Sequence, residues 1–182
     1  MGTPRPTRRL LLVCHTVELV ALSIWIGGLV VIIGSVIPAV FNSFGMETGG
    51  RFLTRVFEGY NRLVTLASGG LVSSALWRFW LSSRGDRMDA SVSRSEWALL
   101  TVMIGVAGFM MLVLWPKSVT LQEQAFAIQS EAARKASYEA FFRAHTVVRG
   151  LYLLNLGLGI ALLVVKVRSL LVTRASQEDV TR

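Results

Sequence analysis

The sequence of residues 10–41 is LLLVCHTVELVALSIWIGGLVVIIGSVIPAVF, and it decides the fold of the chain. Glu18 is the only residue in it with a formal charge. About 20 apolar residues already cross the hydrocarbon of a bilayer, so this run predicts a helix that spans a membrane. His15 and Glu18 lie near one end of that helix, where an ionisable side chain needs a partner or a function.

The composition of the whole chain agrees with a membrane protein. Of its 182 residues, 53% are hydrophobic, and the mean hydropathy is +0.55, well above what a soluble domain needs for its core. The net charge is +8, and the Lys and Arg residues are spread over both termini and every loop. This predicts contact with anionic lipid headgroups and no nucleic-acid partner. Cys14 is the only cysteine, so no intrachain disulfide can form, and we expect it to pack as a small hydrophobe.

Hydropathy and periodicity predict one all-α membrane domain over residues 1–182. The expected spans cover about residues 10–36, 63–81, 97–115 and 150–166. We expect Pro38 and residues 42–50 to break the first helix, and Pro116 to end or kink the third. Helically spaced apolar residues predict amphipathic extramembrane helices at about 47–62 and 117–148. The predicted fold is an integral membrane antiparallel four-helix bundle with amphipathic helical extensions on one side.

Small and polar residues inside the spans predict where helices meet. Pairs of small residues four apart let helix backbones approach closely. Such pairs are Ser23 with Gly27, Gly69 with Ser73, Gly70 with Ser74, and Gly157 with Ala161. We expect Asn155 to join two helices by a hydrogen bond. Lys and Arg residues are denser on the side that holds the termini, which predicts cytoplasmic termini.

His15 and Glu18 form the first candidate site. They lie three residues apart on one helix face, which Leu22, Trp25 and Leu29 continue. An imidazole and a carboxylate on one helical turn can ligate a metal ion, or the histidine can hold a haem iron that the acid tunes. The alternatives are that both side chains reach water near the membrane surface, or that Glu18 belongs to a proton relay or substrate pathway.

His145 and Arg149 form the second candidate site, just before the fourth span. Cationic neighbours there could gather an anionic headgroup or a haem propionate, and the alternative is an interfacial or capping histidine. The predicted topology puts His15 and His145 at opposite membrane faces, so they would not sandwich one haem. No nucleophile with a paired base, zinc spacing or phosphate-binding glycine loop is present. The sequence thus offers no positive motif for an enzyme.

Several of these motifs together resemble the transmembrane protein 205-like family, in its bacterial branch of unknown function. They are His15, Trp25-Ile26-Gly27-Gly28, the exit from Pro38 to Phe41, Trp115-Pro116, Phe141-Phe142-Arg143-x-His145, and Leu154-Asn155-Leu156. The first helix is also similar to that of the copper resistance D proteins and of membrane protoporphyrinogen oxidases of the HemJ type. The resemblance implies a four-helix protein of the bacterial inner membrane. It connects the chain with platinum-drug tolerance, copper handling, or haem held by a first-helix histidine.

The leading hypothesis is a non-catalytic module that binds haem b or a transition-metal ion, within or beside a membrane redox assembly. The expected cofactor-binding residues are His15, Glu18, Trp25, His145 and Arg149, with His15 and Glu18 as metal ligands. The expected partners are the lipid bilayer and other membrane-protein subunits or a second copy. One alternative is metal-cation transport or tolerance, suggested by the methionines Met103, Met110 and Met111. Another is a purely structural subunit that docks onto another membrane protein.

Overall fold

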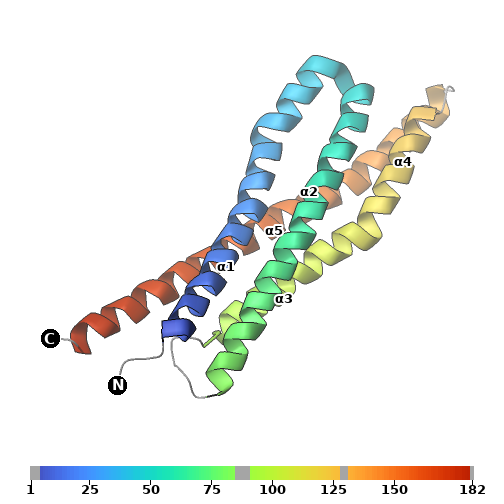
Figure 1. Cartoon of the computed structure of the whole chain (residues 1–182). Helices are drawn as coiled ribbons and strands as arrows, with labels where there is room; N and C mark the ends of the chain where they lie inside the picture. The colour runs from blue at the N-terminus through green and yellow to red at the C-terminus, as the bar shows by residue number, and fades with distance from the viewer. Residues whose placement is uncertain (1–4, 85–90, 128–130, 181–182) are drawn as a thin grey trace.

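The computed structural model describes residues 5–84, 91–127 and 131–180, and every element in this part of the chain is helical. In chain order the elements are α1 (Arg5–Val31), η1 (Ile32–Val36), α2 (Ile37–Ser83), α3 (Arg94–Phe109), η3 (Met110–Leu114), α4 (Trp115–Ala127) and α5 (Glu131–Val180). The start of α1, the end of α5 and the facing ends of α2 and α3 lie at the same end of the molecule (Figure 1).

The first helical arm does not end at Pro38, as the sequence predicted, but continues through it. A proline lacks an N–H, and its ring clashes with the carbonyl of the fourth residue before it. The helix accommodates this with the π-helical turn η1, in which the Ile37 N–H donates to the Ile32 carbonyl five residues earlier. The chain reverses at Gly45, whose φ of 71° and ψ of −170° are non-helical (Figure 1). Such angles favour glycine because it lacks a Cβ.

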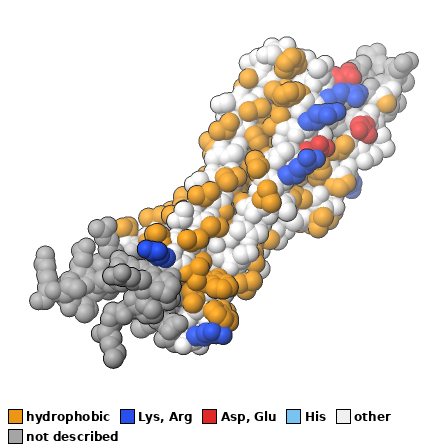
Figure 2. Space-filling view, in the orientation of Figure 1, with side chains coloured by type: hydrophobic (Ala, Val, Ile, Leu, Met, Phe, Trp, Pro, Cys, Tyr) orange, Lys and Arg blue, Asp and Glu red, His pale blue; other side chains and the backbone are white. Residues whose placement is uncertain are grey.

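Three helical segments are long and apolar enough to cross a membrane. They are Arg9–Ser83, Arg94–Gln124 and His145–Leu171. Large apolar side chains point outward, and those of Leu66 and Leu112 are 74% and 80% exposed. Hydrophobic side chains cover the middle of the face in Figure 2, whereas several acidic and basic side chains gather toward the end far from the termini. A surface of this kind is solvated by lipid rather than water.

The core forms where α1 packs on α2 and α5, and where α5 packs on α3 and α4. Three glycines allow close approaches between these helices. A Cβ at Gly28 would lie 3.0 Å from the Tyr60 ring, one at Gly70 would lie 3.3 Å from Val17, and one at Gly159 would lie 3.2 Å from Ile26. Backbone-to-side-chain contacts, rather than matched pairs of small residues, therefore set these helix separations.

The prediction from small-residue pairs was wrong for three of the four pairs. Gly27, Gly69 and Gly157 are exposed and have no atom within 4 Å of an added Cβ, and their partners Ser23, Ser73 and Ala161 are exposed as well. Only Gly70 with Ser74 lies at a helix contact, where Ser74 is buried. Spacing along one helix cannot indicate which face meets a neighbour.

The N-terminal half of the chain, α1 with η1 and α2, corresponds to the C-terminal half at its prolines, its π-helical turns and a set of buried positions. Pro38 and Pro116 are 78 residues apart, and each follows a π-helical turn that ends two residues earlier. Buried positions repeat at the same interval of 78: Glu18 and Glu96, Leu22 and Leu100, Trp25 and Met103, Leu29 and Ala107, Ile32 and Met110. In α2 and α5 the interval is 88: Val64 and Tyr152, Ala67 and Asn155, Leu71 and Gly159, Ser74 and Leu162, Arg78 and Lys166. The fold is thus an internal structural repeat.

Candidate functional site

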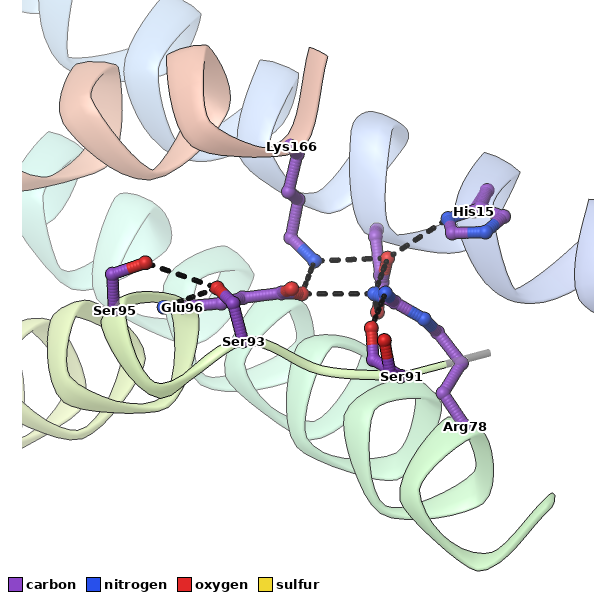
Figure 3. A network of polar contacts seen from close by, with 8 residues as sticks. His15, Arg78, Ser91, Ser93, Ser95, Glu96 and Lys166 are labelled. Carbon is purple, nitrogen blue, oxygen red and sulfur yellow. Dashed lines mark hydrogen bonds and ion pairs between the residues drawn. The ribbon is translucent and has the colours of Figure 1, made fainter. Parts of the chain in front are cut away.

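Four charged side chains from four different helices meet at the end of the core nearest the termini (Figure 3). Glu18 on α1, Arg78 on α2, Glu96 on α3 and Lys166 on α5 are 1%, 3%, 2% and 6% exposed, respectively. We call these four residues the charge cluster. They occupy equivalent positions of the two halves, so each half supplies one carboxylate and one cation. The cluster lies at the interface between the halves.

Each cation of the charge cluster contacts both carboxylates. Nη1 of Arg78 donates to Oε1 and Oε2 of Glu18, at 3.1 and 3.0 Å, and to Oε1 of Glu96, at 2.8 Å. Nζ of Lys166 lies 2.9 Å from Oε2 of Glu18 and donates to Oε1 of Glu96. Two negative and two positive charges balance. This balance compensates for removing the four groups from water, which an unpaired charge could not do.

Local structure at the start of α3 holds Glu96 in the cluster. The Ser93 hydroxyl caps the helix by accepting a hydrogen bond from the Glu96 N–H, at 3.1 Å. The carbonyl of Ser91, just before this cap, accepts from Nη2 of Arg78, at 3.2 Å. The segment that enters α3 thus fixes both Glu96 and Arg78. Nε of Arg78 is buried and has no hydrogen-bond partner among the described residues.

Each cation of the charge cluster has a second carboxylate as an alternative partner. Because every cation is bonded to two carboxylates, a proton on either glutamate would leave both cations with one charged partner. Buried groups with such alternatives are typical of ion and proton pathways in membrane proteins.

His15 lies at the edge of the cluster, as the spacing to Glu18 predicts. Its Nδ1 is 3.5 Å from Oε2 of Glu18, and its side chain is 23% exposed, whereas Glu18 is buried (Figure 3). An imidazole at this place connects the buried carboxylate with the outside of the core. Cys14, next to it, is buried as expected for a small hydrophobe.

The geometry does not fit Glu18 as a ligand of a metal ion. Its two oxygens already face Arg78, Lys166 and His15, and two cations beside it repel a third. No group of three His, Cys, Asp or Glu side chains suited to a metal ion occurs among the described residues. Glu18 is better placed to orient His15 as a ligand, since a carboxylate often accepts a hydrogen bond from the second ring nitrogen of a histidine that binds a metal. Among the described residues of the site, His15 is then the side chain left to act as a ligand.

The other predicted cofactor-binding residues lie away from the cluster. Trp25 is two helical turns beyond Glu18, is buried, and accepts a hydrogen bond at its carbonyl from the Tyr60 hydroxyl, at 2.8 Å. His145 precedes Lys166 by 21 residues of α5, which is about 32 Å along a helix. It is half-buried, and Arg149, one turn later, is exposed. The structure therefore brings His15 together with Glu18, but not with Trp25, His145 or Arg149.

Asn155 does not make the hydrogen bond that its place in the fourth span predicted. Its side chain is buried, yet Oδ1 has no hydrogen-bond partner within the part of the chain that the structure describes. It lines a cavity of about 10 Å³ in the core, together with Trp25, Tyr60 and Tyr152. A buried oxygen without a donor is rare in folded proteins and calls for an explanation.

Sequence reasoning missed three of the four charges of the cluster. Arg78 and Lys166 fell at the boundaries of expected spans, where basic residues commonly extend toward headgroups, and Glu96 fell in an expected turn. The internal repeat could have found them. Glu18 and Glu96 share the 78-residue interval of Pro38 and Pro116, so a role for one carboxylate implies a role for the other.

Comparison with known proteins identifies a family but no characterised relative. Neither the curated proteins nor the solved structures include a match to the chain. A family model matches residues 20–127, which contain both π-helical turns, Arg78 and Glu96, whereas Glu18 and Lys166 lie outside the matched range. Because this match covers more than half of the chain, the protein belongs to the family described as a domain of unknown function, DUF4149.

Proposed function

We propose that the chain crosses a membrane four times and moves a small monovalent cation, protons included, between two equivalent helical hairpins. The Arg9–Ser83 segment would be about 112 Å long as one straight helix, several times the thickness of the hydrocarbon layer. The reversal at Gly45 divides it into two antiparallel crossings, and the second half supplies two more. The described helices then form the antiparallel four-helix bundle expected from the sequence.

This topology puts both termini and the α2–α3 connection on one side. Residues 1–9, 78–95 and 166–182 hold 11 Lys and Arg in 44 residues, whereas residues 36–62 and 116–149 hold 8 in 61. The denser side is cytoplasmic by the positive-inside rule. For a bacterial protein, the membrane is then the inner membrane.

The observation that carries the transport proposal is the charge cluster at the interface of a repeated structure. Buried ion pairs are weak evidence for stability, since well-packed apolar side chains often stabilise as much. Ionisable side chains inside membrane proteins instead mark pathways for ions and protons. Many transporters are built from internal repeats, with sites at the repeat interface and interrupted helices at corresponding positions. The charge cluster, η1 and η3 show these three features together.

Flux into liposomes tests the proposal. The purified full chain is reconstituted with a pH-sensitive dye inside, and gradients of NaCl, KCl and NH₄Cl are imposed in turn, with empty liposomes as the baseline. We expect flux above baseline for at least one salt, and at least a tenfold loss in Glu18→Gln and in Glu96→Gln. The matched control is Glu58→Gln, which changes an exposed glutamate of α2. Baseline flux for the wild type, or unchanged flux in a monodisperse Glu18→Gln variant, would overturn the proposal.

A second candidate function keeps His15 as a ligand of haem b or a transition-metal ion in a redox assembly. The observation that favours it is the Glu18 carboxylate beside Nδ1 of His15. This contact leaves Nε2 for the iron or metal ion, whose other ligands a partner subunit or a second copy would supply. Absorption spectra and metal analysis of the wild type, His15→Ala and His145→Ala separate the cases. This candidate requires a haem band or a bound metal that is lost only in His15→Ala.

A further inference from the structure

One face of α2 points away from the other helices and ends in aromatic and basic side chains. From the middle of the helix toward the end that holds the termini, this face presents Gly69, Ser73, Trp77, Trp80 and Arg84, at intervals of three or four residues. All five are exposed. We call these five residues the outer face of α2. It combines two small residues with two large rings and a positive charge.

The two tryptophans orient Arg84 at the end of the outer face. The guanidinium carbon of Arg84 lies 3.6 Å from the centroid of the Trp80 ring, and the rings of Trp77 and Trp80 have their centroids 5.3 Å apart. Within the described residues, the Arg84 side chain makes no hydrogen bond or ion pair. An indole that covers one face of a guanidinium leaves the N–H groups at its edges able to bind an oxyanion.

The level of Arg84 along the helix corresponds to the headgroup region of a membrane. Tryptophans such as Trp77 and Trp80 are enriched where a spanning helix meets the headgroups. Leu11 of α1 and Leu81 of α2 form a small buried cluster at this end. Arg9 precedes Leu11 by two residues and is exposed, so a second arginine lies at nearly the same level on the neighbouring helix. Positive charge gathered at this level favours an anionic headgroup.

The small residues of the outer face leave room for an acyl chain. Gly69 has no atom within 4 Å of an added Cβ, and Ser73 is exposed one turn later. Leu66 and Leu76, which are 74% and 53% exposed, surround this low stretch with apolar surface. Ser73 is 11 residues before Arg84, which is about 16 Å along a helix, or roughly half of the hydrocarbon thickness. A lipid with its phosphate at Arg84 would therefore extend one chain over Ser73 and Gly69.

The equivalent face of α5 lacks the aromatic end. At the 88-residue interval of the repeat, the two small residues have small and exposed counterparts, Gly157 and Ala161. The aromatic and basic residues have different counterparts, which are Val165, Arg168 and Val172. The repeated architecture therefore does not require the two tryptophans and the terminal arginine of α2. The comparison also supplies matched controls within the same molecule.

We propose that the outer face of α2 binds one anionic phospholipid. Its phosphate accepts hydrogen bonds from the Arg84 guanidinium, and one acyl chain lies over Ser73 and Gly69. The occupant is a lipid rather than a soluble phosphate, because the face continues from the cation into apolar surface. The termini are assigned to the cytoplasmic side, where the leaflet carries a negative surface potential. The inference rests on the proposed membrane crossing by α2 and goes beyond the proposed transport function.

Native mass spectrometry of the purified full chain in detergent tests the proposal. Dioleoyl phosphatidylglycerol or dioleoyl phosphatidylcholine is titrated, and the Kd of the first bound lipid is measured. We expect phosphatidylglycerol to bind at least tenfold more tightly than phosphatidylcholine, because only its headgroup is anionic. Glycerol phosphate serves as a soluble competitor that has no acyl chain. It is expected not to displace the bound phosphatidylglycerol.

Variants that keep the net charge separate a specific site from general attraction between a basic protein and an anionic lipid. Arg84→Lys removes the planar guanidinium, Trp80→Leu removes its stacking partner, and Gly69→Leu fills the space for the acyl chain. Each is expected to weaken phosphatidylglycerol binding at least fivefold. The matched controls are Arg168→Lys and Gly157→Leu on α5, which should change the Kd less than twofold. All five positions are exposed, so these variants should fold as the wild type does.

Equal affinity of the wild type for the two lipids would overturn the proposal. Controls that weaken binding as much as Arg84→Lys and Trp80→Leu would overturn it too, since net charge alone would then attract the lipid. Displacement by glycerol phosphate would mean that a soluble anion is the occupant. The measurement is independent of flux. A lipid preference without wild-type flux would contradict transport alone, and flux without a lipid preference would contradict this site alone.

Discussion

At the scale of single residues, Arg78 is the side chain on which the charge cluster depends most. Its guanidinium reaches both carboxylates and the Ser91 carbonyl, so its loss leaves Lys166 as the one cation of the charge cluster for two carboxylates. We expect Arg78→Met to lower the free energy of unfolding by about 3–5 kcal/mol, the usual effect of breaking a buried ion pair from one side. Thermal unfolding in detergent, followed by circular dichroism, measures the change.

A charge-balanced variant separates this effect from a simple loss of packing. Arg78→Met combined with Glu96→Leu leaves one carboxylate with one cation, so we expect the double variant to be more stable than Arg78→Met alone. Arg62→Met, at an exposed position of α2, should change stability by no more than about 0.5 kcal/mol. If Arg78→Met behaves like Arg62→Met, the cluster does not stabilise the helix arrangement.

Gly28 and Gly27 allow a matched test of residue-scale packing. A Cβ at Gly28 would lie 3.0 Å from the Tyr60 ring, which a hydrogen bond to the Trp25 carbonyl holds in place, whereas one at Gly27 would meet nothing within 4 Å. We expect Gly28→Ala to destabilise the protein by about 1–3 kcal/mol through overpacking. Gly27→Ala should be neutral or slightly stabilising. Equal unfolding midpoints for the two variants would contradict this account of the contact between α1 and α2.

The sequence predicted part of the candidate site for a physical reason. His15 and Glu18 stand out because charged and imidazole side chains are rare inside a long apolar run, and their spacing places them on one helix face. Arg78 and Lys166 do not stand out, because basic residues at the ends of spans are common. Which helices are neighbours is a property of the packed molecule. For that reason the amino-acid sequence alone could not show that these four charged side chains meet.

At the scale of elements, Gly45 makes the turn that divides α2. Its φ of 71° with a ψ of −170° belongs to a region that residues with a Cβ rarely adopt. Gly45→Ala is expected to destabilise the protein by about 1–3 kcal/mol, although no neighbour obstructs the added atom. The control is Gly59→Ala, a helical and exposed position in α2, where alanine should stabilise by up to about 1 kcal/mol. A neutral result for Gly45→Ala in thermal unfolding would mean that the turn has another cause.

The two prolines show what an element-level prediction omits. Helical periodicity locates the apolar stretches around Pro38 and Pro116, and a proline normally ends or kinks a helix. In the structure each proline lies near the start of an α-helix that directly follows a π-helical turn, η1 or η3, and the helical chain continues through it. A π-helical turn has no distinctive amino-acid composition by which the sequence could reveal it. The repeat adds only that the two turns occur at equivalent places, each ending two residues before a proline.

At the scale of the whole molecule, the repeat gives the two halves of the chain equivalent buried positions. Glu18 with Arg78 and Glu96 with Lys166 are equivalent pairs, but each cation also contacts the carboxylate of the other half. Each half is neutral by itself, with one carboxylate and one cation, but only the two halves together give each of these four groups both of its charged partners. The charge cluster makes the two halves depend on each other, which is a requirement for coupled movement of repeats around a central site.

The orientation of the two halves in the membrane can be tested by labelling single cysteines. With Cys14→Ser as background, Arg84→Cys reports the end that holds the α2–α3 connection, and Thr48→Cys and Lys117→Cys report the opposite end, all at exposed positions. A membrane-impermeant maleimide is added to intact and to inverted vesicles. We expect Arg84→Cys to react on the side of a C-terminal tag, and Thr48→Cys and Lys117→Cys to react on the other side. Reaction of Arg84→Cys and Thr48→Cys from the same side would mean that the later arm of α2 does not cross, because only a crossing separates these two positions.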